Sequence, residues 1–118
     1  MGIDITIVRN TVTRRALQQI ADRMFNGEFV KAVVDIDREI LAIGGELHAD
    51  EEQVLIADGS RQRDLWGINL YPARADDGWI EYDSMINLRP SQGNRTRSVD
   101  DPAVRECIVG IIDTRVTT

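Results

Sequence analysis

Residues 65–88 read LWGINLYPARADDGWIEYDSMINL, and this stretch decides the fold that the sequence predicts. Two runs rich in apolar and aromatic residues, 65–71 and 79–88, flank a segment that contains proline, aspartate and glycine. This pattern is typical of two strands joined by a turn, so the sequence predicts an antiparallel hairpin. In its second strand, positions 80, 82, 84, 86 and 88 form one face, and positions 81, 83, 85, 87 and 89 form the other.

The N-terminal part predicts a strand followed by a helix. Isoleucines at positions 3, 5 and 7 alternate with residues 4, 6 and 8, which is the period of a strand with one buried face. Apolar residues then recur at helical spacing over 16–24, and Thr13 is placed to accept hydrogen bonds from the first helical turn. The helix should stop at Asn26-Gly27, because this pair is typical of helix ends.

A second hairpin is predicted after this helix. Valine-rich residues 29–36 form its first strand, with positions 30, 32, 34 and 36 on one side. A tight turn at 37–38 leads into the second strand over 39–50, where two glycines at 44–45 indicate a bulge or a close backbone approach.

Two more helices complete the prediction. The spacing of Asp50 and Gln53 is that of a capping box, which predicts a short helix over 51–58 that Gly59 would end. The last helix begins at Asp101-Pro102 and carries apolar residues at helical spacing. The single cysteine, Cys107, falls on that apolar stripe, so it is predicted to lie in the core.

The resulting order is β-α-β-β-(short α)-β-β-α, in which hairpins replace the strict alternation of strand and helix that a parallel fold shows. We therefore expect an α+β fold with a largely antiparallel sheet of about five strands and two main helices. A chain of 118 residues has the size of one domain, so residues 1–118 are assigned to a single domain.

Composition and charge exclude several classes of protein. A hydrophobic fraction of 42% and a charged fraction of 29% are ordinary for a globular domain. The apolar runs are far too short to cross a membrane and no secretion signal is visible, so we expect a cytoplasmic protein. A single cysteine cannot form an intramolecular disulfide, and the net charge of −6 disfavours nucleic acids and anionic lipids as partners.

Four stretches resemble a known family. They are VKAVVDID at 30–37, ILAIGGELHAD at 40–50, DLWGINLYP at 64–72 and IEYDSMINLRPSQGNR at 80–95. The sequence is similar to a family of small prokaryotic proteins described only as a domain of unknown function, and the similarity runs over nearly the whole chain. The resemblance implies a small domain that stands alone, but it implies no activity and no site residues.

The main anomaly in the sequence is RPSQGNRTR at 89–97, which has three arginines, no acidic residue and no large hydrophobic residue. Guanidinium forks, amides, hydroxyls and glycine-permitted backbone N–H groups suit a phosphate or a carboxylate. This segment therefore predicts an anion-binding loop, provided that its guanidinium groups converge on one cavity. The predicted ligand-binding residues are Arg89, Ser91, Gln92, Asn94, Arg95 and Arg97. The alternative is a solvated connector whose arginines pair with neighbouring acids.

Two sets of residues at alternate strand positions are candidates for catalysis or metal binding. Glu81 and Asp83 share one face of the strand that leads into the loop, and nearby carboxylates can share a proton or bind a divalent cation. Glu46, His48 and Asp50 would also point to one side, where an imidazole can bind a metal or act as a base. The catalytic candidates are His48, Glu81 and Asp83, and the metal candidates are Glu46, His48 and Asp50. A charged, solvent-exposed strand face explains Glu81 and Asp83 without any function. The second set has one histidine only and lacks the multiple cysteines and histidines of zinc sites.

Three functions fit these features. The first is a module that binds a small anionic ligand through the arginine-rich loop. The second is a small hydrolase of a phosphoester or nucleotide, in which the acidic residues or His48 transfer protons and the arginines stabilise negative charge. The third is a homodimeric interaction module without a small ligand. The sequence leaves open whether the protein is an enzyme, and it identifies no cofactor.

Overall fold

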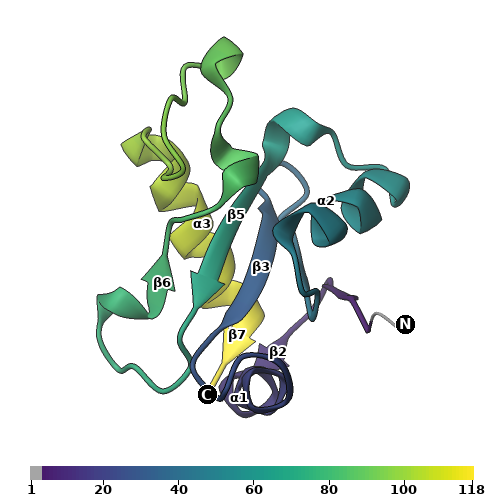
Figure 1. The fold of residues 1–118 in the computed structure, drawn as a ribbon, viewed down its shortest axis with the longest axis vertical. Coiled ribbons are helices and arrows are strands. Elements are labelled where there is room, and N and C mark those ends of the chain that lie inside the picture. Colours follow the sequence, from purple (N-terminus) through teal and green to yellow (C-terminus); the bar gives the residue numbers. More distant parts are fainter. Residues whose placement is uncertain (1–3) are drawn as a thin grey trace.

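The computed structural model describes residues 4–118 and contains a five-stranded antiparallel sheet in the order β1-β4-β3-β5-β6 (Figure 1). The strands are β1 (Thr6–Val8), β3 (Val30–Asp35), β4 (Ile40–Ile43), β5 (Leu65–Leu70) and β6 (Ile80–Glu81). The predicted α+β class and five-stranded antiparallel sheet are confirmed. Ile3, which the sequence places in the first strand, lies outside the described residues.

Helices cover both faces of the sheet. They are α1 (Arg14–Met24), α2 (His48–Ala57) and α3 (Pro102–Arg115). Helix α2 packs on one face, and α1 and α3 pack on the other (Figure 1). A short parallel pair, β2 (Val12–Thr13) and β7 (Val116–Thr117), joins the segment before α1 to the segment after α3. None of the helices in residues 4–118 has the length and apolar character needed to cross a membrane.

The predicted ends of α1 and α3 are confirmed by their capping contacts. The Thr13 side chain accepts a hydrogen bond from the Ala16 N–H at 3.0 Å, and the Asp101 side chain accepts one from the Ala103 N–H at 2.9 Å. After α1, Asn26 and Gly27 have φ angles of 56° and 77°, the left-handed conformation that ends a helix.

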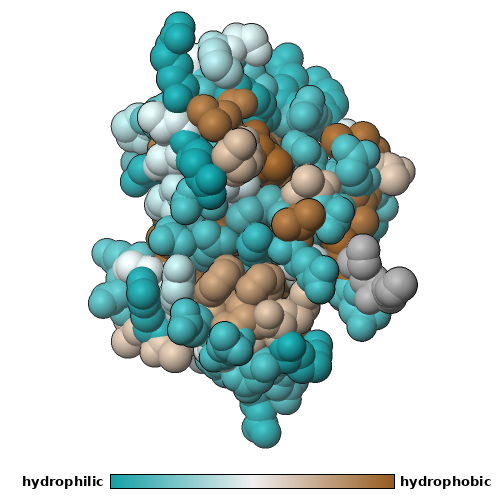
Figure 2. Space-filling model, viewed as in Figure 1, coloured by the Kyte–Doolittle hydropathy of each residue, from teal (hydrophilic) through white to brown (hydrophobic). Residues whose placement is uncertain are grey.

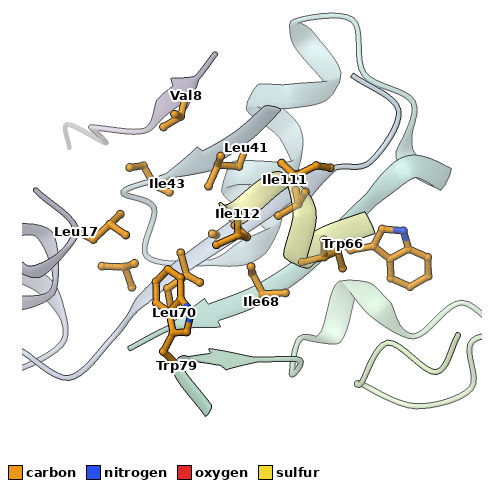
Figure 3. Packing of buried hydrophobic residues seen from close by; sticks show 14 of the residues in the cluster. Val8, Leu17, Leu41, Ile43, Trp66, Ile68, Leu70, Trp79, Ile111 and Ile112 are labelled. Carbon is orange, nitrogen blue, oxygen red and sulfur yellow. The ribbon is translucent and has the colours of Figure 1, made fainter. Parts of the chain in front are cut away.

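The larger hydrophobic core lies between the sheet and the layer of α1 and α3 (Figure 3). Each fully buried leucine or isoleucine contributes roughly 1.5–3 kcal/mol to folding. The core residues that Figure 3 labels include Leu17, Leu41, Ile43, Ile68, Leu70, Ile111 and Ile112. Trp66 and Trp79 belong to the same cluster.

The face under α2 has a smaller apolar cluster. Leu55 of α2 packs there with Val33, Ala42 and Leu65 of the sheet. This cluster covers only part of the face, so polar residues of β3, β5 and β6 can lie beside it.

The predicted strand over 39–50 is wrong beyond Ile43. Gly44 has a φ angle of 96°, so the chain turns out of the ladder there and begins α2 at His48. The predicted capping box is also absent, because Leu47 is the N-cap residue and Asp50 lies within the first helical turn. Gly59, with a φ angle of 111°, follows the helix as predicted.

The second strand of the predicted hairpin is shorter than the sequence indicates. Its pairing ends at Glu81, and Ser84 begins a 3-10 turn over Met85–Asn87. The expected alternation therefore breaks down, leaving Met85 63% exposed and Asn87 fully buried. The physical reason is a side chain: Asn87 accepts from the Gly67 N–H at 2.9 Å and donates to the Gly67 carbonyl at 3.0 Å. An amide thus replaces the backbone partner that a longer strand would have supplied.

The predicted core position of Cys107 is wrong, because Cys107 is exposed. The buried residues of α3 are Ile108, Ile111 and Ile112, which share one narrow stripe. Cys107 lies about 100° around the helix from Ile108, so it falls at the edge of this stripe.

Candidate functional site

The sheet face under α2 becomes polar where β3, β5 and β6 run side by side. Lys31 of β3 pairs with Asn69 of β5, which pairs with Glu81 of β6. Lys31 is two residues from Val33, whose side chain packs with Leu55 of α2, so both point to the face that α2 covers. Figure 2 shows hydrophilic residues in a band across the middle of this side of the molecule.

His48 is the first residue of α2, and only 8% of its surface is exposed. Its Nε2 lies 2.8 Å from the carbonyl oxygen of Ile68. A carbonyl can only accept a hydrogen bond, so Nε2 carries the proton and Nδ1 is the acceptor. Burial is the largest cause that lowers the pKa of His48, and the charge of Lys31 lowers it further against the opposing effect of the Ile68 hydrogen bond. His48 is therefore a neutral imidazole at pH 7.

Glu51 lies three residues after His48, on the same side of α2, and its side chain is completely buried. Its Oε2 accepts a hydrogen bond from the Gly45 N–H at 2.9 Å, whereas Oε1 has no partner within residues 4–118. Burial raises the pKa of Glu51 well above its usual value, and the Gly45 hydrogen bond and the Lys31 charge oppose this only in part. The carboxyl thus retains its proton at a pH where an exposed glutamate is ionised.

Asn69 links this region to the acidic residues of the adjoining segment. Its Nδ2 donates to Glu81 Oε1 at 2.9 Å and to the Asp83 carbonyl at 3.3 Å. Its Oδ1 is buried and has no hydrogen-bond partner in the described part of the chain. Asp83 forms an ion pair with Arg97 at 2.6 Å, and both charges act on the pKa of His48. We define the α2 site as Lys31, His48, Glu51, Asn69 and the Asp83–Arg97 pair.

A glycine of β5 makes room for this arrangement. A Cβ atom at Gly67 would lie 3.2 Å from Cδ2 of His48 and 2.6 Å from both Cβ and Oγ of Ser84. Gly67 therefore lets the imidazole and the Ser84 segment approach the strand together, which a larger residue would prevent.

The α2 site combines several groups that favour a negatively charged oxygen. Lys31 supplies an ammonium group, and Glu51 can supply a hydroxyl donor while protonated. The N-terminus of α2 has no side-chain cap, so its first N–H groups have no capping side chain as a partner, while the negative charge of Asp50 in the first turn offsets part of the positive end of the helix dipole. His48 adds a proton acceptor, which makes acid–base chemistry at the same place feasible.

The expected convergence of the loop arginines does not occur. The guanidinium of Arg89 donates to the carbonyls of Gln62 and Leu65 and lies 4.3 Å from the centre of the Trp66 ring. Arg97 pairs with Asp83, 14 residues earlier in the chain. Arg89 therefore binds the loop to the backbone around the start of β5, while Arg97 pairs with Asp83 at the α2 site.

The remaining loop residues divide between structural and exposed roles. Asn94 is buried, and its Nδ2 donates to the carbonyls of Asn87, Thr96 and Ser98 while its Oδ1 accepts from the Asp100 N–H. Gln92 donates to the Arg63 carbonyl, whereas Ser91 and Arg95 are exposed. A cavity of about 440 Å³ adjoins the loop, and two of the predicted ligand-binding residues, Gln92 and Asn94, line it together with Arg63, Asp64, Asp100 and Asp101. None of the three loop arginines lines it.

The prediction that Glu46, His48 and Asp50 point to one side is wrong. Glu46 precedes α2, and His48 and Asp50 lie in its first turn instead of on a strand, so the latter two are separated by about 200° around the helix rather than aligned. Glu46 is exposed while His48 is buried. No group of three or more acidic, histidine or cysteine residues within residues 4–118 is arranged to hold a metal ion.

Sequence reasoning included His48, Asp83 and Arg97 among the candidates but missed Lys31, Glu51 and Asn69. Glu51 follows His48 at helical spacing, so a helix that begins at 48 would have indicated it. Lys31 and Asn69 are single polar residues inside strongly apolar strands, a pattern that signals a polar spot on a buried face.

These features define a small α+β domain of three layers, whose central sheet carries a polar site beside the first turn of α2. The chain belongs to the family described as a protein of unknown function (DUF5674), which matches residues 6–115. Comparisons with curated proteins and with solved structures find no significant match.

Replacing Glu51 with glutamine should make the stability of the protein less dependent on pH. The folded state keeps a proton on Glu51 that the unfolded chain releases above its own pKa of about 4.3, so stability falls as pH rises from there through the folded pKa. The loss amounts to about 1.4 kcal/mol for each unit by which the folded pKa exceeds the unfolded one.

Urea unfolding of the wild type and Glu51→Gln between pH 4 and 8 measures this effect. The wild type should lose stability relative to Glu51→Gln as pH rises, while other titrating groups cancel in the difference. A difference that stays constant over this range contradicts the raised pKa.

Proposed function

We propose that this domain binds a small anionic ligand, one that carries a phosphate or carboxylate group, at the α2 site. The observation that carries the proposal is Oε1 of Glu51, a buried oxygen without a partner within residues 4–118 that can donate a hydrogen bond while the carboxyl is protonated, close to Lys31. The buried Oδ1 of Asn69 also has no partner there, and because an amide oxygen only accepts, it would bind a hydroxyl or N–H group of the ligand and not its anionic oxygens. A buried polar atom without a hydrogen bond costs roughly 1–3 kcal/mol, and an apolar residue would avoid that cost. Their presence favours a function for this surface over a purely structural role.

The chemistry of the site favours an anion over a cation. Lys31 provides a positive charge, and the uncapped start of α2 provides N–H donors. The carboxylates of Glu81 and Asp83 are already engaged by Asn69 and Arg97. Burial raises the pKa of Glu51 and so favours its neutral carboxyl, which repels an anion less than a carboxylate does.

Inorganic phosphate should raise the melting temperature of the wild type, compared with sodium chloride at equal ionic strength, because a ligand that binds only the folded state stabilises it. Lys31→Met should abolish this rise, since it removes the ammonium and keeps the apolar stem. Differential scanning calorimetry over a range of phosphate concentrations measures both effects.

Arg95→Ala is the matched control, because it also removes one positive charge but lies on the exposed loop. It should keep the stabilisation by phosphate. If Arg95→Ala loses the effect and Lys31→Met retains it, the ligand binds at the loop predicted from the sequence, and the assignment to the α2 site fails.

A small phosphoester or nucleotide hydrolase is the second candidate, and one specific observation favours it. The pKa of His48 is lowered while the pKa of Glu51 is raised, so the environment favours the imidazole as a proton acceptor and the carboxyl as a proton donor. Turnover of p-nitrophenyl phosphate or bis-p-nitrophenyl phosphate that disappears in His48→Ala would support an enzyme. Saturable phosphate binding without turnover would support the binding module.

The homodimer without a small ligand stays a prediction from the sequence. Sedimentation velocity at several protein concentrations tests it directly, because a stable dimer sediments with the mass of two chains and a reversible dimer shows a sedimentation coefficient that rises with concentration.

A further inference from the structure

Three aromatic rings adjoin the α2 site on the same side of the sheet. Phe25 and Phe29 stack with their ring centres 4.6 Å apart, and the ring of Tyr71 lies 5.6 Å from that of Phe29. All three are only partly buried. We define these residues as the aromatic patch.

The strand register places the aromatic patch next to the polar row. Lys31 and Asn69 are paired across β3 and β5, and the next positions on the same face are Phe29 and Tyr71. Residues two apart on a strand are about 7 Å apart, so the rings begin where the polar groups end. Figure 2 shows a hydrophobic area directly below the hydrophilic band on this side of the molecule.

Two contacts join the aromatic patch to the α2 site. The ammonium of Lys31 lies 5.8 Å from the centre of the Phe25 ring, so the group that would attract an anion is beside the rings. The hydroxyl of Tyr71 donates to Glu81 Oε1 at 3.0 Å, the same oxygen that accepts from Asn69. The polar and aromatic parts are therefore held in one rigid arrangement.

We propose that the ligand of the α2 site has a planar ring attached to its anionic group, as a nucleoside monophosphate has, and that the ring stacks on the aromatic patch. The inference rests on the proposed function, because the α2 site must first hold the anionic group. Aromatic side chains beside a cationic group are the usual means by which proteins hold a base and its phosphate, and stacking is tolerant of which base is present.

The test compares three probes by isothermal titration calorimetry: AMP, ribose 5-phosphate and adenosine. AMP should bind about 5- to 150-fold more tightly than ribose 5-phosphate, the range that stacking of one base on aromatic residues produces. Adenosine should bind more weakly than AMP, because it lacks the phosphate. Lys31→Met should weaken the binding of AMP and leave that of adenosine unchanged.

Phe29→Leu and Phe29→Tyr form a matched pair of variants. Leucine keeps an apolar side chain but has no ring face, so Phe29→Leu should bring AMP and ribose 5-phosphate to nearly equal affinity. Phe29→Tyr keeps the ring and should retain the preference. Melting temperatures within a few degrees of the wild type confirm that both variants are folded.

The failure of this inference can be distinguished from the failure of the proposed function. Equal binding of AMP and ribose 5-phosphate to the wild type overturns the ring inference and leaves the anion site in place. Equal binding of adenosine and AMP, or no binding by either phosphate, overturns both.

Discussion

Asn87→Ala should destabilise the protein by roughly 2 kcal/mol or more, because it leaves the buried N–H and carbonyl of Gly67 without a partner at roughly 1–3 kcal/mol each, whereas the Arg97 carbonyl keeps its bond from the Ser84 N–H. Asn87 is fully buried, and its amide bonds both the N–H and the carbonyl of Gly67 and also the Arg97 carbonyl at 2.9 Å. Urea unfolding monitored by circular dichroism measures the loss.

Two further variants make this prediction specific. Asn87→Asp can still accept from the Gly67 N–H, but its charge faces the carbonyls of Gly67 and Arg97, so it should be strongly destabilised at pH 7 and partly recover in acid. Asn10→Ala changes an exposed asparagine and should alter stability by no more than about 0.5 kcal/mol. If Asn87→Ala were as mild as Asn10→Ala, the amide would not be replacing a strand partner.

Gly67→Ala should cost roughly 1–3 kcal/mol of stability and should also abolish stabilisation by phosphate. The added methyl group would meet Ser84 at 2.6 Å and His48 at 3.2 Å, so the 3-10 turn and the imidazole must both move. The single added methyl group is thus expected to lower stability and to prevent phosphate binding. Scanning calorimetry with and without phosphate measures both.

A control variant in α3 is expected to change stability in the opposite direction. Gly110 lies within α3 and an added Cβ would meet nothing within 4 Å, so Gly110→Ala should stabilise the protein by about 0.5–1 kcal/mol. Ser84→Gly in the Gly67→Ala background should recover part of the stability, because it removes the two atoms at 2.6 Å. A Gly67→Ala variant as stable as the wild type would show that the strand and the turn are not closely packed.

The sequence by itself determined those helices and strands whose ends and buried faces are set by residues close to them in the chain. The caps at Thr13 and Asp101, the helix end at Asn26-Gly27 and the valine-rich β3 were all predicted, because helix capping and strand alternation act over a few residues. The antiparallel sheet followed from the hairpins. Even the core role of Trp66 could be inferred from its position in an apolar strand.

Only the tertiary structure decided where β4 and β6 end. Because the candidate site lies where these strands give way to α2 and to the Ser84 segment, its position was also decided there. The segment after Gly44 alternates like a strand, yet it forms α2 because Glu51 and His48 find their partners, the Gly45 N–H and the Ile68 carbonyl, only in the folded chain. In the same way, Asn87 stops β6 by bonding Gly67, 20 residues earlier. The contacts of His48 and Asn87 each join residues 20 positions apart, and the contact between Glu51 and Gly45 is strengthened by burial that exists only after folding, so local patterns alone do not reveal these contacts.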